Sequence, residues 1–145
     1  MERSLPIAAE RWTIAQKGVL LIALFQLGWA LAGFLAEPTF AVGDDAPTER
    51  VLGVDFNGWH ALSGFLLFGP ALIFALRPDW SLLYAISAGL LLAITGLWAL
   101  FSTQVAYVFT FPNNESDAVL HLATGALFLT IAAIQISRDR ARPRL

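Results

Sequence analysis

Four long stretches without a charged side chain dominate this sequence. They cover residues 18–36, 56–76, 80–114 and 118–137, which amount to 19, 21, 35 and 20 residues. An α-helix needs about 20 mostly apolar residues to cross the hydrocarbon core of a bilayer. Hydrophobic residues make up 57% of the chain and charged residues 14%, against about 45–50% and about 25% in soluble domains. The sequence therefore predicts an all-α integral membrane protein, a bundle of four transmembrane helices.

The expected spans lie at about 17–36, 57–76, 80–102 and 117–137. The third uncharged stretch is too long for one helix, so its last part is expected to form a loop at the membrane surface, where Tyr and Phe are favourable. We expect Asp79 to cap the third helix and Ser116 or Asp117 to cap the fourth. Such side chains accept hydrogen bonds from the free N–H groups of a first helical turn.

Length predicts a single membrane domain at 17–137, between an amphipathic N-terminal segment (1–16) and a basic tail (138–145). Seven of the nine basic residues lie in these end segments or in the short connection between the second and third spans, and Lys17 is the first residue of the first span. The longer connections hold seven acidic residues and one basic residue, Arg50. The positive-inside rule therefore predicts that both termini lie in the cytoplasm and the two longer connections outside. We expect a multi-pass protein of the bacterial inner (plasma) membrane. Arginines just after a span indicate contact with anionic lipid, so no nucleic-acid partner is expected.

The only two histidines of the chain occur in matching segments, HALSG at 60–64 and HLATG at 121–125. A second match, FQLGWAL at 25–31 and AITGLWAL at 93–100, places a glycine shortly before a tryptophan in the preceding span. Each pair of spans would then form one helical hairpin. The matches favour two repeated hairpins related by an axis along the membrane normal.

Helical spacing gives each histidine a polar and small-residue face. Residues three and four apart share a face, so Ser63 and Gly64 lie beside His60 in the same way as Thr124 and Gly125 lie beside His121. An imidazole that faces lipid is costly, so both rings are expected to face the interior. The positive N-terminal end of a helix disfavours imidazolium, which leaves neutral rings able to accept a hydrogen bond or to bind a metal.

Two groups of site residues follow from these patterns. Asn57 and Asp117 each precede a histidine on its own face, so the expected polar cluster is His60, His121, Asn57, Asp117, Ser63 and Thr124. Small residues let helix backbones approach each other. The glycines expected at helix contacts are Gly28, Gly64, Gly89, Gly96 and Gly125.

The chemistry of this cluster has more than one interpretation. The first is a polar clasp between the hairpins, in a non-enzymatic scaffold or accessory subunit whose partners are the lipid bilayer and a second membrane protein or another copy of the chain. The alternative is a redox protein in which His60 and His121 bind haem or, together with Asp117, a transition metal, although no signature such as HExxH is present. A small transporter or channel subunit is a third alternative.

Several chemistries are excluded or lack support. The chain has no cysteine, so it cannot form disulfides, zinc–thiolate sites or iron–sulfur clusters. Phosphate-binding loops and a nucleophile with an oxyanion hole are not recognisable. These observations favour a non-enzymatic role, in which a bound cofactor is either absent or is the metal or haem named above.

Seven residues form a motif at the starts of the second and fourth predicted helices: Asn57, His60, Gly64, Asn113, Asp117, His121 and Gly125. This motif resembles that of a known family, the small bacterial four-helix membrane proteins catalogued as domain of unknown function 4383. The resemblance runs from about residue 17 to 137 and implies the same four-helix fold and the same choice of residues. In that family the first motif often has a second His or Asn beside the histidine, whereas Gly58 and Trp59 occupy this stretch here. No activity is assigned to the family, so the resemblance implies no function.

Overall fold

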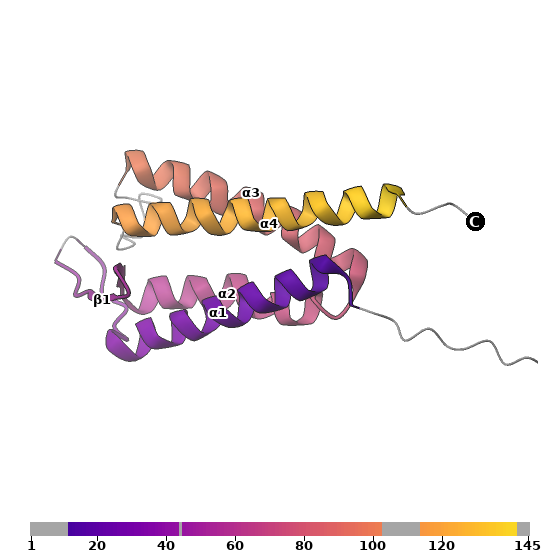
Figure 1. Cartoon of the computed structure of the whole chain (residues 1–145). Coiled ribbons are helices and arrows are strands. Elements are labelled where there is room, and N and C mark those ends of the chain that lie inside the picture. The colour runs from indigo at the N-terminus through magenta and orange to yellow at the C-terminus, as the bar shows by residue number, and fades with distance from the viewer. Residues whose placement is uncertain (1–11, 44, 103–113, 142–145) are drawn as a thin grey trace, which may run out of the picture.

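Four α-helices make up most of the computed structural model, which describes residues 12–43, 45–102 and 114–141. They are α1 (Ile14–Ala36), α2 (Gly58–Phe74), α3 (Pro78–Phe101) and α4 (Glu115–Ala141) (Figure 1). The prediction of an all-helical chain with four helices is confirmed. By length and composition, α1, α3 and α4 can each cross a membrane, and α2 is a shorter apolar helix of 17 residues. Most of the N-terminal segment, most of the surface loop and the end of the basic tail lie outside the described residues.

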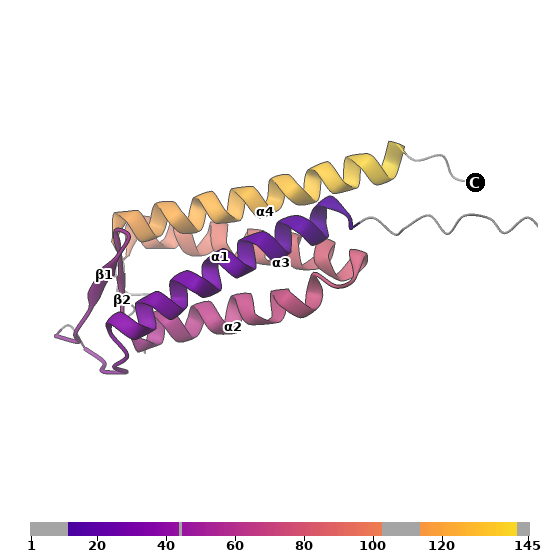
Figure 2. The same ribbon diagram turned by 60° about the horizontal axis from the view of Figure 1, so that its bottom comes forward.

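The helices are arranged as two pairs, α1 with α2 and α3 with α4 (Figures 1 and 2). The start of α1 and the end of α4 lie at one end of the bundle, which we call the terminal end (Figure 1). The starts of α2 and α4 lie at the opposite end. No Cα atom of α2 comes within 8 Å of a Cα atom of α4, so these two helices face each other across side chains only.

The helix starts differ from the caps expected from the sequence. Asn114, not Ser116 or Asp117, caps α4, because its Oδ1 accepts a hydrogen bond of 2.9 Å from the backbone N–H of Asp117. The N-cap of α3 is Arg77, which makes no side-chain capping bond, and Pro78 takes the first helical position. Proline is favoured there because its missing N–H would have no partner in the helix. Asp79 lies in the first turn, where its charge interacts favourably with the helix dipole.

Two glutamines fasten the terminal end of the bundle. The Oε1 of Gln135 on α4 accepts hydrogen bonds from the backbone N–H groups of Ile14 and Ala15, at 3.1 and 3.4 Å. Gln16 donates from Nε2 to the carbonyl of Ala75 at 3.0 Å. Both glutamines are buried, so α1 is joined to α4 and to the end of α2 by bonds that water cannot easily replace.

Glycines set the close contact between α3 and α4. A Cβ atom added at Gly125 would lie 2.8 Å from the backbone nitrogen of Ala93 and 2.9 Å from the carbonyl oxygen of Gly89. At Gly96 it would lie 2.9 Å from a carbonyl oxygen of α4. Gly28 is different: it is exposed, and an added Cβ would meet no described atom within 4 Å, so among residues 12–43, 45–102 and 114–141 Gly28 makes no helix contact of the kind expected.

The pair α1 and α2 uses a glycine in the same way. A Cβ added at Gly64 would lie 2.9 Å from the Cβ of Ala30. Tyr84 of α3 joins the two pairs, because its hydroxyl donates to the carbonyl of Leu67 on α2 at 2.8 Å and its ring lies against Phe74 of α2. Its ring packs edge-on against Phe128 of α4, which is fully buried.

A β-hairpin between α1 and α2 lies at the end of the bundle opposite the termini. Strand β1 (Glu49–Val51) pairs antiparallel with β2 (Val54–Phe56), and the two turn residues, Leu52 and Gly53, have φ values of 51° and 88°. A two-residue turn with both φ values positive matches the twist of a hairpin. The sequence analysis expected a loop here without identifying the strands. We refer to this end as the hairpin end.

Hydrogen bonds attach the hairpin to two helices. Trp29 of α1 donates from Nε1 to the carbonyl of Val51 at 3.1 Å. Asn114, at the start of α4, donates from Nδ2 to the carbonyl of Gly53 at 3.1 Å. The hairpin is therefore fastened to α1 and to the start of α4, and β2 leads directly into α2.

Candidate functional site

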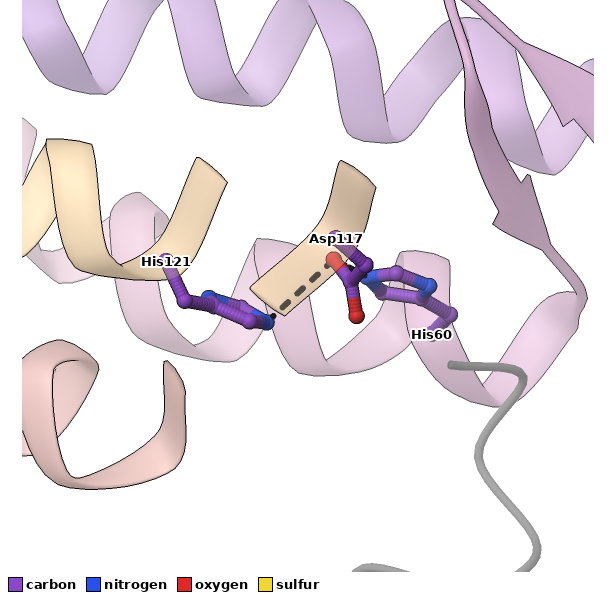
Figure 3. Close-up of side chains that lie close together, drawn as sticks. All are labelled: His60, Asp117 and His121. Atoms are coloured by element: carbon purple, nitrogen blue, oxygen red, sulfur yellow. Dashed lines mark ion pairs between the residues drawn. The ribbon is translucent and has the colours of Figure 1, made fainter. Parts of the chain in front are cut away.

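The two histidines and Asp117 meet at the hairpin end, in the space between α2 and α4. Asp117 lies between the two imidazoles (Figure 3). Its Oδ1 is 3.6 Å from Nε2 of His60 and 3.4 Å from Nε2 of His121. The side chains of His60, His121 and Asp117 are 12%, 22% and 7% exposed. The structure thus brings together the three residues that the sequence analysis named as candidate metal ligands.

Two capping asparagines place these side chains. His60 is the third residue of α2, and its backbone N–H donates to Oδ1 of Asn57 at 3.0 Å. Asp117 is the third residue of α4 and bonds in the same way to Asn114. His121 follows Asp117 by one helical turn, so it projects from the same face. Because Asn114 caps the helix, the carboxylate of Asp117 is free to face the interior.

The ring of His60 is held in one tautomer. Its Nδ1 lies 2.9 Å from the carbonyl oxygen of Asp55, which can only accept a hydrogen bond, so Nδ1 is the nitrogen that carries the hydrogen. The ring of Phe56 stacks on the imidazole, with centroids 4.4 Å apart and planes 16° apart. In the neutral ring the Nε2 lone pair is therefore directed toward Asp117.

The buried Oδ1 atom of Asp117 lacks a hydrogen-bond partner among the described residues. Leaving a buried acceptor unsatisfied costs about 1–3 kcal/mol, and more for a charged group. The helix dipole favours a negative Asp117 and disfavours a positive His60, because both lie in the first turn of a helix. A carboxylate oxygen and two imidazole nitrogens thus face one another, and a cation between them would satisfy all three.

The distances suit a small metal ion. The ligand atoms of the three residues lie within 4.8 Å of one another. Zinc binds His nitrogen and carboxylate oxygen at about 2.0–2.2 Å in a tetrahedron, whose ligand atoms are therefore about 3.4 Å apart. The two separations measured from Asp117 match this value. A histidine that binds a metal usually donates its other N–H to a carbonyl or carboxylate, which is the bond that His60 makes to Asp55.

A comparison with protein-family models gives the relationship of the chain. The model of the family described as "Domain of unknown function (DUF4383)" matches residues 16–134. The chain belongs to this family. The resemblance that the motifs predicted is thereby confirmed, and the three candidate ligands lie within the residues that match the DUF4383 model. No curated protein and no solved structure matches the chain.

The other polar residues that the sequence analysis named are close to the ligands but make their own bonds. Asn57 is buried and caps α2, and its Nδ2 has no partner among the described residues. Ser63 donates to the carbonyl of His60 in the same helix, at 2.7 Å. Thr124 is buried one turn beyond His121 and accepts a hydrogen bond of 3.1 Å from Gln26 of α1. In this DUF4383 chain they surround the ligands rather than join them.

Some residues of the site were not found by sequence reasoning. Gln26 could have been found, since it is a polar side chain in the middle of an apolar span and such residues usually have a role. Asp55 and Phe56 carried no such signal. Asp55 acts on His60 through its backbone carbonyl, and a backbone group has no signature in a sequence.

A cavity of about 240 Å³ begins at the three ligands of the DUF4383 chain and extends between the helix pairs. Side chains from all four helices and from β2 line it. Apart from the ligands, most of these residues are apolar. An ion held by the three ligands would therefore lie at the edge of this cavity.

A salt bridge stabilises the β-hairpin beside the site. Arg50 donates to both carboxylate oxygens of Asp55, at 2.7 and 3.2 Å. This bond lowers the pKa of the Asp55 carboxyl from its ordinary value. The pair holds the two strands together next to the carbonyl group that orients His60.

Asp55→Asn should lower the melting temperature above about pH 5, and its effect should shrink as the solution becomes more acidic. A carboxyl whose pKa is lowered by folding stabilises the fold fully above its ordinary pKa and loses this contribution as the pH falls through the lowered value. The effect should be small, because the Arg50 side chain is 67% exposed. Thermal melting of both proteins in detergent from about pH 3 to pH 7 checks this. A difference that stays constant across this range would contradict it.

Proposed function

We propose that this protein is a multi-pass membrane protein that binds one divalent transition-metal ion through His60, Asp117 and His121. The observation that carries the proposal is the buried Oδ1 of Asp117, which has no hydrogen-bond donor in the part of the chain that the structure describes and faces two imidazole nitrogens at 3.6 and 3.4 Å. If the cluster were only a clasp of hydrogen bonds, this oxygen atom would be expected to accept one. In the proposed function a metal ion binds the oxygen instead and joins α2 to α4.

The ligand set favours a single ion over haem. Two histidines that ligate a haem iron lie on opposite faces of the macrocycle, whereas here Asp117 lies in the space between the rings (Figure 3). Two imidazoles and one carboxylate suit zinc or ferrous iron. Three protein ligands leave at least one position of the ion open, as in zinc sites that present the metal to a further ligand.

The proposed topology places the metal site at the outer face of the bacterial inner membrane. All four helices cross the bilayer, with the 17 residues of α2 at the lower limit for a span. The start of α1 and the end of α4 lie at the same end of the bundle, and nearly all basic residues belong to segments at that end (Figure 1). The positive-inside rule then assigns the terminal end to the cytoplasm and the hairpin end to the outside.

Cobalt binding tests the proposal. Co²⁺ prefers similar ligands to Zn²⁺ and absorbs visible light strongly in a tetrahedral site. Titration of the detergent-purified protein should reach a ratio of one ion per chain, and Zn²⁺ should displace the cobalt, as the order of metal affinities requires. Removal of a residue that only hydrogen-bonds to a ligand typically lowers metal affinity 10–100-fold. Removal of a ligand itself should cost more, so His60→Ala and His121→Ala should each weaken binding at least about 100-fold.

Ser63→Ala is the matched control, because Ser63 lies one turn from His60 and bonds only within its own helix. It should bind cobalt like the wild type. If the wild type takes up no cobalt and the histidine variants only melt at lower temperature, the polar clasp is the correct interpretation. Equal binding by wild type and both histidine variants would place any metal elsewhere.

A further inference from the structure

The cavity beside the three ligands is polar at one end and apolar along its length. His60, Asp117 and His121 form the polar end. The rest of the wall consists largely of side chains that offer no hydrogen bond, among them Ala30, Phe56, Leu67, Phe68, Leu92 and Leu120, and the indole N–H of Trp29 is already bonded to the carbonyl of Val51. A space lined in this way holds water poorly, because a buried water needs two to four polar partners.

Two polar side chains deeper beside the cavity, Gln26 and Thr124, form a hydrogen bond with each other. The Nε2 of Gln26 donates to the hydroxyl of Thr124 at 3.1 Å, and both residues are buried. The hydroxyl of Ser63 at the wall donates to the carbonyl of its own helix. Molecules that enter the cavity therefore meet their principal polar partners at the end where the metal ligands lie.

The cavity also reaches the surface of the bundle. Leu91 lines it and is 52% exposed, and its neighbours on the outer face of α3 are exposed apolar side chains such as Leu90 and Ile94. Such a surface faces lipid in a membrane helix. A route from the hydrocarbon region to the metal ligands thus lies along α3.

We infer that this cavity binds the apolar part of a small amphiphile from the membrane, whose oxygen head group occupies the open position of the metal ion. The inference rests on the proposed metal site and names the ligand class for it. An oxygen donor completes the coordination of a zinc-type ion that has three protein ligands. A volume of 240 Å³ corresponds to about eight groups of water size, at about 30 Å³ each, so a chain of similar length fits.

Two hydroxamates test the inference, since both have the same metal-binding head. Octanohydroxamate adds an apolar chain of the size of the cavity, and acetohydroxamate lacks that chain. Both should shift the visible spectrum of the cobalt-loaded wild type, and octanohydroxamate should do so at a concentration at least tenfold lower. Equal affinities would show that the site takes small water-soluble oxygen ligands and would overturn the inference.

Two adjacent leucines supply the matched variants. Leu91 and Leu90 are 52% and 50% exposed, but only Leu91 lines the cavity. Leu91→Trp should reduce the advantage of octanohydroxamate at least tenfold while leaving acetohydroxamate binding unchanged, and Leu90→Trp should change neither. Thr95→Phe, which narrows the cavity one turn along α3, should act like Leu91→Trp.

Cobalt itself separates the two possible failures. Absence of a cobalt spectrum in the wild type would refute the metal site, and with it the inference. A normal cobalt spectrum in all variants, with the same preference for octanohydroxamate in each, would refute the cavity as the chain-binding site while the metal site stands.

Discussion

Metal-free Asp117→Asn protein should melt at a higher temperature than the metal-free wild type, and Zn²⁺ should raise the melting temperature of the wild type only. In the wild type the Oδ1 atom of Asp117 is buried and has no hydrogen-bond partner among the residues that the structure describes. Asparagine has the same shape and offers an N–H₂ group, which at this position lies 3.4 Å from the Nε2 atom of His121 and can donate to it. Relief of one unsatisfied buried group is worth about 1–3 kcal/mol.

Added metal should reverse the order of the two proteins. At a free Zn²⁺ concentration of 100 times its dissociation constant, binding adds about 2.7 kcal/mol to the stability of the wild type. The variant gains nothing, because an asparagine is a poor substitute for the carboxylate ligand. Differential scanning calorimetry in detergent measures both melting temperatures, once with EDTA for the metal-free proteins and once with Zn²⁺.

The sign of the metal-free difference separates the metal site from a charged clasp. If either histidine carries a second proton and forms an ion pair with Asp117, the asparagine variant loses that pair and melts lower than the wild type. Asp79→Asn is the control, because Asp79 is also an aspartate in the first turn of a helix but is exposed. It should lower stability slightly, through the helix dipole, and should leave the Zn²⁺ effect intact.

Gly125→Ala should reduce the free energy of unfolding by about 1–3 kcal/mol, the usual range for overpacking a close contact. The added methyl group would lie 2.8 Å from a backbone nitrogen and 2.9 Å from a carbonyl oxygen of α3. Backbone atoms cannot rotate away as side-chain atoms do, so α3 and α4 have to separate. Unfolding by SDS in mixed micelles measures the loss.

Gly28→Ala is the matched control, because Gly28 lies in another long apolar helix, α1, at a position that is not crowded. Nothing lies within 4 Å of an added Cβ at this position, and alanine favours a helix over glycine by up to about 1 kcal/mol. Its stability should be unchanged or slightly raised. A similar loss in both variants would mean that the α3–α4 contact is not as close as the structure has it.

The sequence predicted those parts of the fold that depend on the periodicity and length of apolar runs. Four uncharged stretches became four helices, and the small residues Gly89, Gly96 and Gly125 lie where α3 and α4 meet. Gly28, like Gly96, comes shortly before a tryptophan in an apolar helix, but it faces outward. Sequence spacing alone does not define which face of a hydrophobic helix is covered, because every face is apolar.

For the site, the sequence predicted the residues but not their bonds. His60, His121 and Asp117 stood out because ionisable side chains are rare in apolar helices. The sequence analysis expected Ser116 or Asp117 to cap α4, and Asn114 does so instead; the change frees Asp117 for the interior. The tautomer of His60 depends on the carbonyl of Asp55, and thus on a β-hairpin whose turn contains leucine in a left-handed conformation, which is rare for that residue.

The different fastening of the two ends of the bundle has a mechanical consequence. Gln16 and Gln135 join α1 to its neighbours by buried hydrogen bonds at the terminal end. At the other end, the backbones of α2 and α4 stay more than 8 Å apart, and the site residues lie between them. The β-hairpin, which bonds to α1 and to the start of α4, joins the two helix pairs at this end, but nothing in the backbone links α2 to α4. An ion held by His60, Asp117 and His121 would supply that link and so stiffen the pair of helices that otherwise meet through side chains alone.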